Sequence, residues 1–140
     1  MIRLTRRYRF SASHRLHAPA LPDDVNRELY GKCNNPYGHG HDYVLEVTVE
    51  GPLEESTGRV CNLATLDELV TRYVVRDLDH RNLNEDTTDF RSVVPTSENV
   101  TVAIEERLKQ AWRSGFPEAW PRLSRIRLEE TKRNSFEHKT

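Results

Sequence analysis

Hydrophobic and polar residues alternate along two long segments of the chain, residues 3–14 and residues 39–49. Consecutive side chains of a β-strand point to opposite faces of the sheet, so this period of two predicts two strands with one apolar face each. The apolar positions are Leu4, Tyr8, Phe10 and Ala12 in the first segment and Tyr43, Leu45, Val47 and Val49 in the second. Arg6 interrupts the first series on its apolar side.

Two further segments, residues 65–78 and 95–112, repeat their apolar residues at spacings of three and four. This spacing predicts two amphipathic helices. At the start of the first helix, Thr65 and Glu68 have the spacing of a capping box, in which each side chain bonds the backbone N–H of the other residue.

The remaining segments complete an α+β pattern. The second helix can be capped by Thr96 or by Ser97. Residues 125–131 and 135–138 predict a closing β-hairpin, and residues 17–37, broken by Pro, Gly and Asn, predict a long loop of functional importance. The order is strand, strand, helix, helix, strand, strand, which indicates an antiparallel sheet with its helices on one face.

Composition narrows the class of protein. With 140 residues, 36% hydrophobic and 31% charged, the chain suits a single domain over residues 1–140 with one modest core. A formal net charge of -1 provides no field to attract nucleic acid. The locally basic residues 3–9 face either a phosphorylated ligand or solvent. Two cysteines are too few for a disulfide scaffold, and the absence of a long apolar run predicts a cytoplasmic protein without a membrane partner.

Three histidines continue the apolar series of the two strands. His14 follows the first series, and His39 and His41 extend the second. If the strands are neighbours, the three imidazoles point to one place. Three nitrogen ligands suit a zinc ion that keeps a fourth position open for water or substrate. The alternative is that each histidine is a solvated or hydrogen-bonded residue at a strand end, but the His-Gly-His spacing favours a metal.

Cys33 lies in the predicted loop shortly before His39. Neighbouring cations are expected to lower the pKa of its thiol, and the thiolate could then act as a nucleophile, a general base or a metal ligand. A fourth protein ligand would close the metal site, which argues against the last role. A thiol without a chemical role is the remaining alternative. Cys61 is interpreted as a small buried hydrophobic residue.

Acid and base side chains occur in two other segments. Asp79 and His80 follow the first predicted helix and could supply a general acid and base, although a histidine at a helix C-terminus is also stabilised by the helix dipole. Glu130 extends the buried side of its predicted strand. An inward carboxylate needs a partner, either the guanidine-like edge of a ligand or one of the many arginines.

Five segments together resemble the 6-pyruvoyl-tetrahydropterin synthase family, which includes the 6-carboxy-tetrahydropterin synthases of queuosine biosynthesis. They are FSASHRL, CNNPYGHGHDY, LDHRNLN, PTSENV and LEET, and they span residues 10–131 in the family's order. The resemblance implies the tunnelling fold, a ββααββ unit whose sheets join into an oligomeric barrel. It also implies a homohexamer, formed as a dimer of trimers, with sites between subunits.

The resemblance further implies a role for each candidate residue. The ligands of Zn²⁺ would be His14, His39 and His41. The catalytic residues would be Cys33 as the proton-abstracting base, Asp79 and His80 as its relay partners, and Glu130 as the anchor of the pterin ring. Further hydrogen bonds to the substrate would come from Thr96 and Ser97.

The family substrate is 7,8-dihydroneopterin triphosphate. Elimination of triphosphate, a carbon–oxygen lyase reaction, would give 6-pyruvoyl-tetrahydropterin without a nicotinamide or flavin. The five-residue gap between Cys33 and His39 is similar to that of the pyruvoyl-type enzymes and favours this product. The alternative is the carboxy-type reaction, which also releases a two-carbon fragment. A pterin- or purine-binding module without turnover is disfavoured, because base, relay and ligands are all present.

Overall fold

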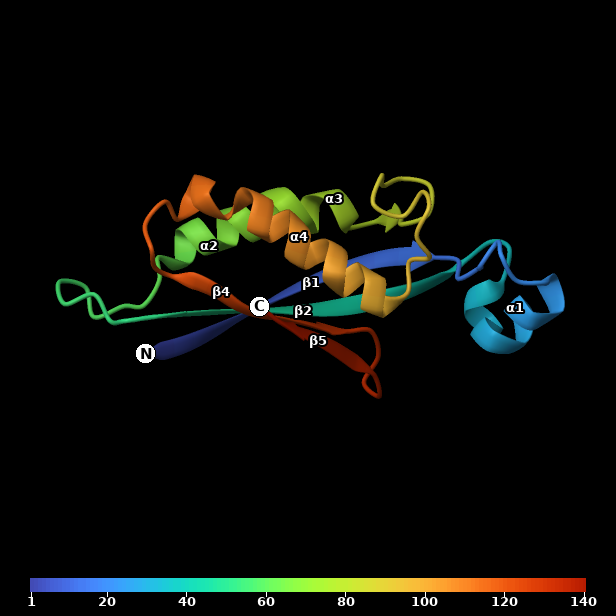
Figure 1. The fold of residues 1–140 in the computed structure, drawn as a ribbon, viewed down its shortest axis with the longest axis horizontal. Coiled ribbons are helices and arrows are strands. Elements are labelled where there is room, and N and C mark those ends of the chain that lie inside the picture. The colour runs from blue at the N-terminus through green and yellow to red at the C-terminus, as the bar shows by residue number, and fades with distance from the viewer.

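The computed structural model describes residues 1–140 and contains one five-stranded sheet (Figure 1). The strands are β1 (Ile2–His14), β2 (His39–Gly51), β3 (Arg81–Asn82), β4 (Arg122–Glu129) and β5 (Ser135–Lys139). Their order across the sheet is β3-β1-β2-β4-β5, and every pairing is antiparallel except that of the short β3 with β1. The predicted α+β class, the antiparallel sheet and the closing hairpin are therefore confirmed.

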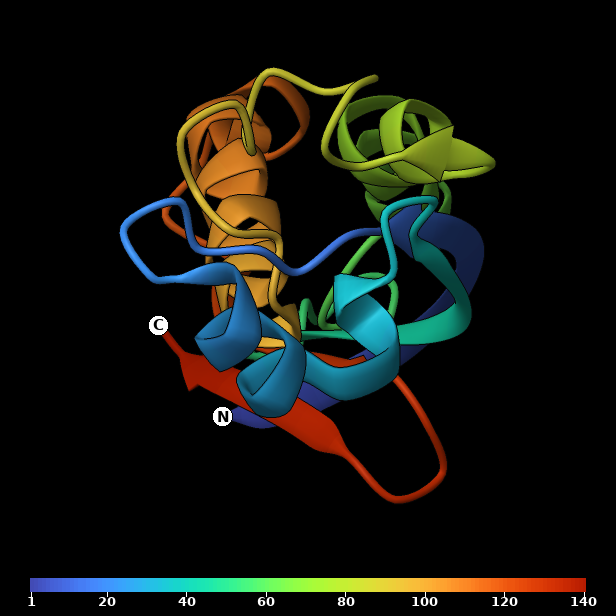
Figure 2. The same cartoon turned by 90° about the vertical axis from the view of Figure 1, so that its right-hand side faces the viewer.

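The main helices cover one face of this sheet. The helical segments are α1 (Asp23–Tyr30), the 3-10 turn η1 (Gly31–Asn34), α2 (Leu63–Val70), the π-helical η2 (Thr71–Val75), α3 (Arg76–Leu78) and α4 (Ser97–Gly115). Figure 2, seen from the end where α1 lies, shows α4 beside the continuous α2–η2–α3 segment, with the sheet beneath both. None of these helices combines the length and the apolar character that a membrane crossing requires.

The core lies between the sheet and these helices, as the alternating pattern predicts. Leu45 and Val47 of β2 and Leu66 and Leu108 of the helices have no exposed surface. Burial of such side chains is the main term that stabilises a domain of this size, at about 1.5–3 kcal/mol for each fully buried side chain. The long β1–β2 ladder consequently has one face fixed against the core, which also fixes its register.

Arg6 is the one charged residue in the apolar series of β1, and the helix layer supplies its partner. Its guanidinium donates two hydrogen bonds to Asp67 of α2, at 3.0 and 2.8 Å. Tyr8 donates a third hydrogen bond to the same carboxylate, at 2.8 Å. The charge of the inward-facing Arg6 is therefore paired with a carboxylate of the helix layer through two parallel hydrogen bonds.

Two sequence predictions about helix starts have different outcomes. The capping box of Thr65 and Glu68 is wrong, because the helix begins earlier, at Leu63, where Asn62 accepts a hydrogen bond from the backbone N–H of Thr65. For the second helix, the prediction is confirmed: Thr96 is the cap and accepts from the backbone N–H of Asn99 at 3.2 Å.

The predicted long loop over residues 17–37 is also wrong, since α1 and the η1 turn occupy most of it. This small unit is organised by polar contacts. The side chain of Asn26 is fully buried and bonds the backbone of Ala18, Leu21 and Pro22. The buried residue of α1 is this asparagine and not an apolar residue. The sequence of the helix therefore lacks the apolar stripe from which a helix is predicted.

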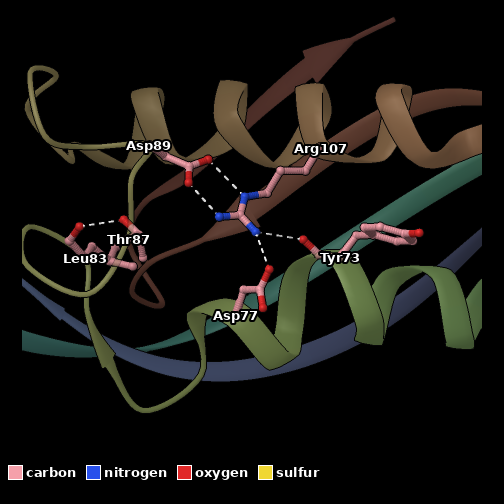
Figure 3. A network of polar contacts seen from close by, with 6 residues as sticks. All are labelled: Tyr73, Asp77, Leu83, Thr87, Asp89 and Arg107. Atoms are coloured by element: carbon pink, nitrogen blue, oxygen red, sulfur yellow. Dashed lines mark hydrogen bonds and ion pairs between the residues drawn. The ribbon is translucent and has the colours of Figure 1, made fainter.

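Arg107 of α4 joins the helix layer to the segment that precedes α4 (Figure 3). Its guanidinium donates to Asp89 at 2.9 and 2.6 Å, to Asp77 at 2.8 Å and to the backbone carbonyl of Tyr73 at 3.0 Å. The Asp89 side chain is 18% exposed and that of Asp77 is 53% exposed. Hydrogen bonding from Arg107 holds the pKa of Asp89 below its ordinary value.

We expect Asp89→Asn to lower the free energy of unfolding by about 1–3 kcal/mol, because it removes the charge from a largely buried bidentate pair. The matched change Asp77→Asn should cost less than about 1 kcal/mol, since that carboxylate is half exposed. Urea titrations of both variants measure the difference, and equal losses would contradict it. The pKa of Asp89 is lower in the folded chain, so its contribution is complete above about pH 4 and is lost as the pH falls further.

Candidate metal centre and active site

The register of β1 against β2 gathers the predicted histidines at one end of the sheet. His14 lies opposite His39, and Ala12 lies opposite His41. The ring centroids of His14 and His41 are 4.9 Å apart, and those of His39 and His41 are 4.8 Å apart. The three imidazoles therefore share one face of neighbouring strands, as the alternation predicts.

His14 and His41 have the features of metal ligands. The His14 side chain is fully buried, and its Nδ1 bonds the carbonyl oxygen of Pro95 at 2.8 Å. Since a carbonyl only accepts, Nδ1 carries the proton and Nε2 has a free lone pair. The Nε2 atoms of both histidines are buried without a hydrogen-bond partner. Buried polar atoms are rarely left unpaired, so a cation fits here.

Burial also sets the protonation state of these two imidazoles. It is the largest influence on each and lowers the pKa of His14 and of His41. Both rings are therefore neutral near pH 7, which is the form that coordinates a metal.

Cys33 completes a set of three donor atoms. One nitrogen of His14, one of His41 and the sulfur of Cys33 lie within 4.8 Å of one another. His39, the third ligand implied by the family resemblance, is not in this set: its side chain is exposed at the start of β2, beside the His41 ring. The protein's own donors thus fit a zinc-type ion, with Cys33 and His39 as competing candidates for the third position.

The turn between Cys33 and β2 is built to bring the thiol back over the histidines. The backbone N–H of Leu16 bonds the Cys33 carbonyl at 2.7 Å, which ties η1 to the end of β1. Gly38 has φ +84°, and a Cβ there would lie 3.1 Å from the His14 carbonyl oxygen. Only glycine combines this left-handed conformation with so close an approach.

The expectation that neighbouring cations lower the pKa of Cys33 is wrong in this structure. Burial raises the pKa of the thiol, nearby Glu130 raises it further, and Lys32 only partly offsets these effects. Sequence proximity to lysine is a poor guide here, because the carboxylate approaches from a distant strand.

Glu130 lies where its strand parity predicts, beside the histidines. One carboxylate oxygen is 3.9 Å from Nε2 of His41, and the other accepts a hydrogen bond from the Ser97 hydroxyl. Ser97 is buried at the start of α4, and the Glu130 side chain is 16% exposed. The structure therefore places a carboxylate that a ligand can reach next to the metal candidates.

Two further residues qualify this picture. The Thr96 hydroxyl serves as the cap of α4, so it is occupied by the backbone N–H of Asn99.

Tyr43 was not among the predicted site residues, although it continues the His39 and His41 series. Its ring is fully buried, 5.7 Å from that of His41, and its hydroxyl has no hydrogen-bond partner.

Asp79 and His80 contact each other, and neither bonds Cys33 in this chain. The Asp79 carboxylate accepts from the backbone N–H of Ser11 at 2.9 Å and is 3.5 Å from Nε2 of His80. His80 has a left-handed φ of 59°, and its side chain is 78% exposed. No hydrogen bond or ion pair links either residue to Cys33, so the pair is formed but presented outward at the β1 edge.

Comparison with known proteins gives a consistent result. A profile of the family described as 6-pyruvoyl tetrahydropterin synthase matches residues 3–140. A protein from Poecilia reticulata named 6-pyruvoyl tetrahydrobiopterin synthase is 44% identical over 131 residues, which cover 94% of this chain and 85% of that protein. The solved structure of Caenorhabditis elegans 6-pyruvoyl tetrahydropterin synthase superposes with a TM-score of 0.88 at 39% identity, covering 99% of this chain and 95% of that one.

A more distant similarity concerns the alternative product. A protein from Rickettsia bellii named 6-carboxy-5,6,7,8-tetrahydropterin synthase is 32% identical over 80 residues. That match covers 57% of this chain and 49% of the other protein. Similarity to the pyruvoyl-named protein is therefore both higher and more extensive.

Proposed function

Because the chain belongs to the 6-pyruvoyl tetrahydropterin synthase family, we propose that it converts 7,8-dihydroneopterin triphosphate into 6-pyruvoyl-tetrahydropterin with elimination of triphosphate. One observation carries the proposal. Two buried imidazole nitrogens without partners, a thiol and a carboxylate meet at one end of the sheet. Such a set joins a metal site to a base and a ligand anchor, which suits proton abstraction better than binding alone.

In this proposal the metal is Zn²⁺, held by His14 and His41 with His39 as the third ligand. The exposed His39 ring is free to change rotamer toward the other two. When bound, zinc supplies Lewis-acid polarisation of the oxygens on the substrate side chain. The positive charge of a bound ion would favour the thiolate form of Cys33, and this thiolate would accept a proton from a carbon of the side chain, because its sulfur lies beside the same nitrogens.

Glu130 is proposed to anchor the pterin ring. Its free carboxylate edge matches the two parallel N–H donors of a guanidine-like ring edge. Ser97 holds the other side of the carboxylate through its hydroxyl hydrogen bond. Thr96 contributes by fixing the start of α4 through its cap.

Asp79 and His80 are proposed to act on a neighbouring subunit. The pair is outward-facing and unconnected to Cys33 within the chain. A site formed between subunits of a homohexamer, a dimer of trimers, would bring His80 of one subunit to Cys33 of another. There it would return a proton while Asp79 orients its ring. We propose that the protein is a cytoplasmic carbon–oxygen lyase and that it works as this hexamer.

The pyruvoyl product is preferred to the carboxy product because of the extent of the two similarities. The test is incubation of the zinc-loaded protein with 7,8-dihydroneopterin triphosphate, with and without a chelator. We expect triphosphate and a pyruvoyl-pterin in equal amounts, and loss of both products with the chelator. Acetaldehyde and a carboxy-pterin would assign the alternative reaction. No turnover by zinc-loaded protein would reject both enzyme functions.

A further inference from the structure

The hydroxyl of Tyr43 is a group of the candidate site that the proposed roles above leave unused. Tyr43 is the only fully buried tyrosine of the chain, and its hydroxyl has no hydrogen-bond partner. Buried polar atoms without a partner are rare in folded proteins. The other unpartnered atoms at the site, Nε2 of His14 and Nε2 of His41, carry lone pairs that a cation satisfies. A phenol O–H is a donor, so it needs an acceptor instead.

The ring of Tyr43 is held on two sides, so its hydroxyl can move little. The ring stacks on that of Phe10, its partner in the β1–β2 ladder, with centroids 4.9 Å apart and an angle of 19° between the planes. The ring of His41 packs edge-on against it at 5.7 Å. A side chain packed in this way in a dense interior keeps its rotamer. An acceptor for the hydroxyl must therefore come from a neighbouring element.

Ser97 and Glu130 are neighbours of this hydroxyl that can accept a hydrogen bond. Burial is the largest influence on the Tyr43 phenol and raises its pKa, and the nearby Glu130 carboxylate raises it further. The Cys33 thiol acts in the same direction, whereas the Ser97 hydroxyl acts in the opposite one. A tyrosine is protonated near pH 7 even without these effects. The phenol is therefore a neutral donor beside a serine hydroxyl and a carboxylate.

Ser97 is the residue through which this phenol can act on the site. Its hydroxyl donates its single proton to Glu130, so the lone pairs of its oxygen are left to accept. No other side chain donates a hydrogen bond to this carboxylate, and Nε2 of His41 is 3.9 Å from it. Ser97 is 2% exposed, so solvent does not compete for its oxygen. The orientation of the carboxylate thus depends on one serine that can accept one more donor.

We infer that Tyr43 is a positioning residue for the ligand anchor: its phenol donates to the Ser97 oxygen, and Ser97 donates to Glu130, while the carboxylate holds the ring edge. The inference rests on the proposed function, which assigns Glu130 to the pterin ring. Tyr43 and Ser97 are not hydrogen-bonded in the chain alone, and a small shift of the serine with the loaded carboxylate brings them together. Successive hydrogen bonds polarise one another, so the three groups hold the ring more tightly than the carboxylate alone.

The test is calorimetry on the zinc-loaded protein with 7,8-dihydroneopterin and with its 2-desamino analogue, which lacks one of the two parallel N–H donors. Neither ligand carries a triphosphate, so binding is measured without elimination. Tyr43→Phe removes the hydroxyl and keeps the stacked ring. We expect it to weaken 7,8-dihydroneopterin about 5-fold or more, the loss of one buried hydrogen bond, to weaken the analogue less, and to leave the zinc content unchanged.

Ser97→Ala and Tyr8→Phe are the companion variants. If the phenol acts through Ser97, Tyr43→Phe should cause no further loss of affinity in the Ser97→Ala background. Tyr8→Phe makes the same change to a phenol that donates to Asp67, at 2.8 Å. It should lower the urea midpoint and leave the affinity for 7,8-dihydroneopterin unchanged. Tyr43→Phe should not lower the midpoint, because its hydroxyl has no partner to lose.

The outcomes separate this inference from the proposed function. Wild-type affinity in Tyr43→Phe, equal weakening of both ligands, or additive losses in the double variant would each show that the inference is wrong, even when the enzyme turns over. If the expected pattern appears but the wild type releases no triphosphate from 7,8-dihydroneopterin triphosphate, the positioning role stands and the proposed function fails. A wild type that binds neither ligand would overturn both.

Discussion

Replacing Cys33 with Ala is expected to abolish turnover of 7,8-dihydroneopterin triphosphate while the protein keeps its zinc. The Cys33 sulfur lies within 4.8 Å of the ligand nitrogens of His14 and His41, close enough to act either on a bound substrate or on the metal itself. If it is the base, its loss removes proton transfer and lowers kcat by about 10²–10⁴-fold or more. Zinc content after gel filtration, together with product formation, measures both effects.

Cys61→Ala is the matched control for this experiment. Cys61 is the other free thiol of the chain; it is buried, it lies before α2 at the other end of the helix layer, and its sulfur donates to the carbonyl of Asn62. This variant should retain wild-type turnover. Zinc loss in Cys33→Ala would identify the thiol as a ligand, and full activity without the thiol would reject it as the base.

The sequence predicts those parts of the fold that depend on apolar periodicity. Alternation locates β1 and β2, and their shared face follows because a strand has no freedom to turn individual side chains to the other side. Glu130 is also located correctly, since it continues the buried parity of Ile126 and Leu128. Pattern alone therefore brings histidines and carboxylate to one end of the sheet.

Other features depend on polar contacts that leave no periodic signal. Helix α1 is organised around the buried Asn26, and Arg6 is accommodated by Asp67 across the sheet–helix boundary. The pKa of Cys33 depends on burial and on Glu130, which is distant in sequence. Asp79 and His80 are recognisable as a pair in the sequence, and the structure places the Asp79 carboxylate 3.5 Å from Nε2 of His80.

The second prediction with a large expected effect concerns the third metal ligand. We expect His39→Ala to lower the bound zinc below one ion per chain and to reduce turnover at least about 100-fold, in line with the loss of a direct ligand rather than an outer-shell contact. His39 suits this test better than His14, because its side chain is exposed and its removal leaves the core intact. The buried His14 ring, bonded to Pro95, would confound metal loss with unfolding.

Tyr37→Ala provides the control, since Tyr37 is 94% exposed in the same turn and belongs to no donor set. It should keep both zinc and activity. Stoichiometric zinc with near-normal turnover in His39→Ala would show that Cys33, His14 and His41 form the ligand set. The thiol could then not be the base, and Cys33→Ala would have to lose the metal. The two substitutions thus give opposite patterns of zinc content under the two ligand assignments, so measuring both decides which residue binds the metal and which moves the proton.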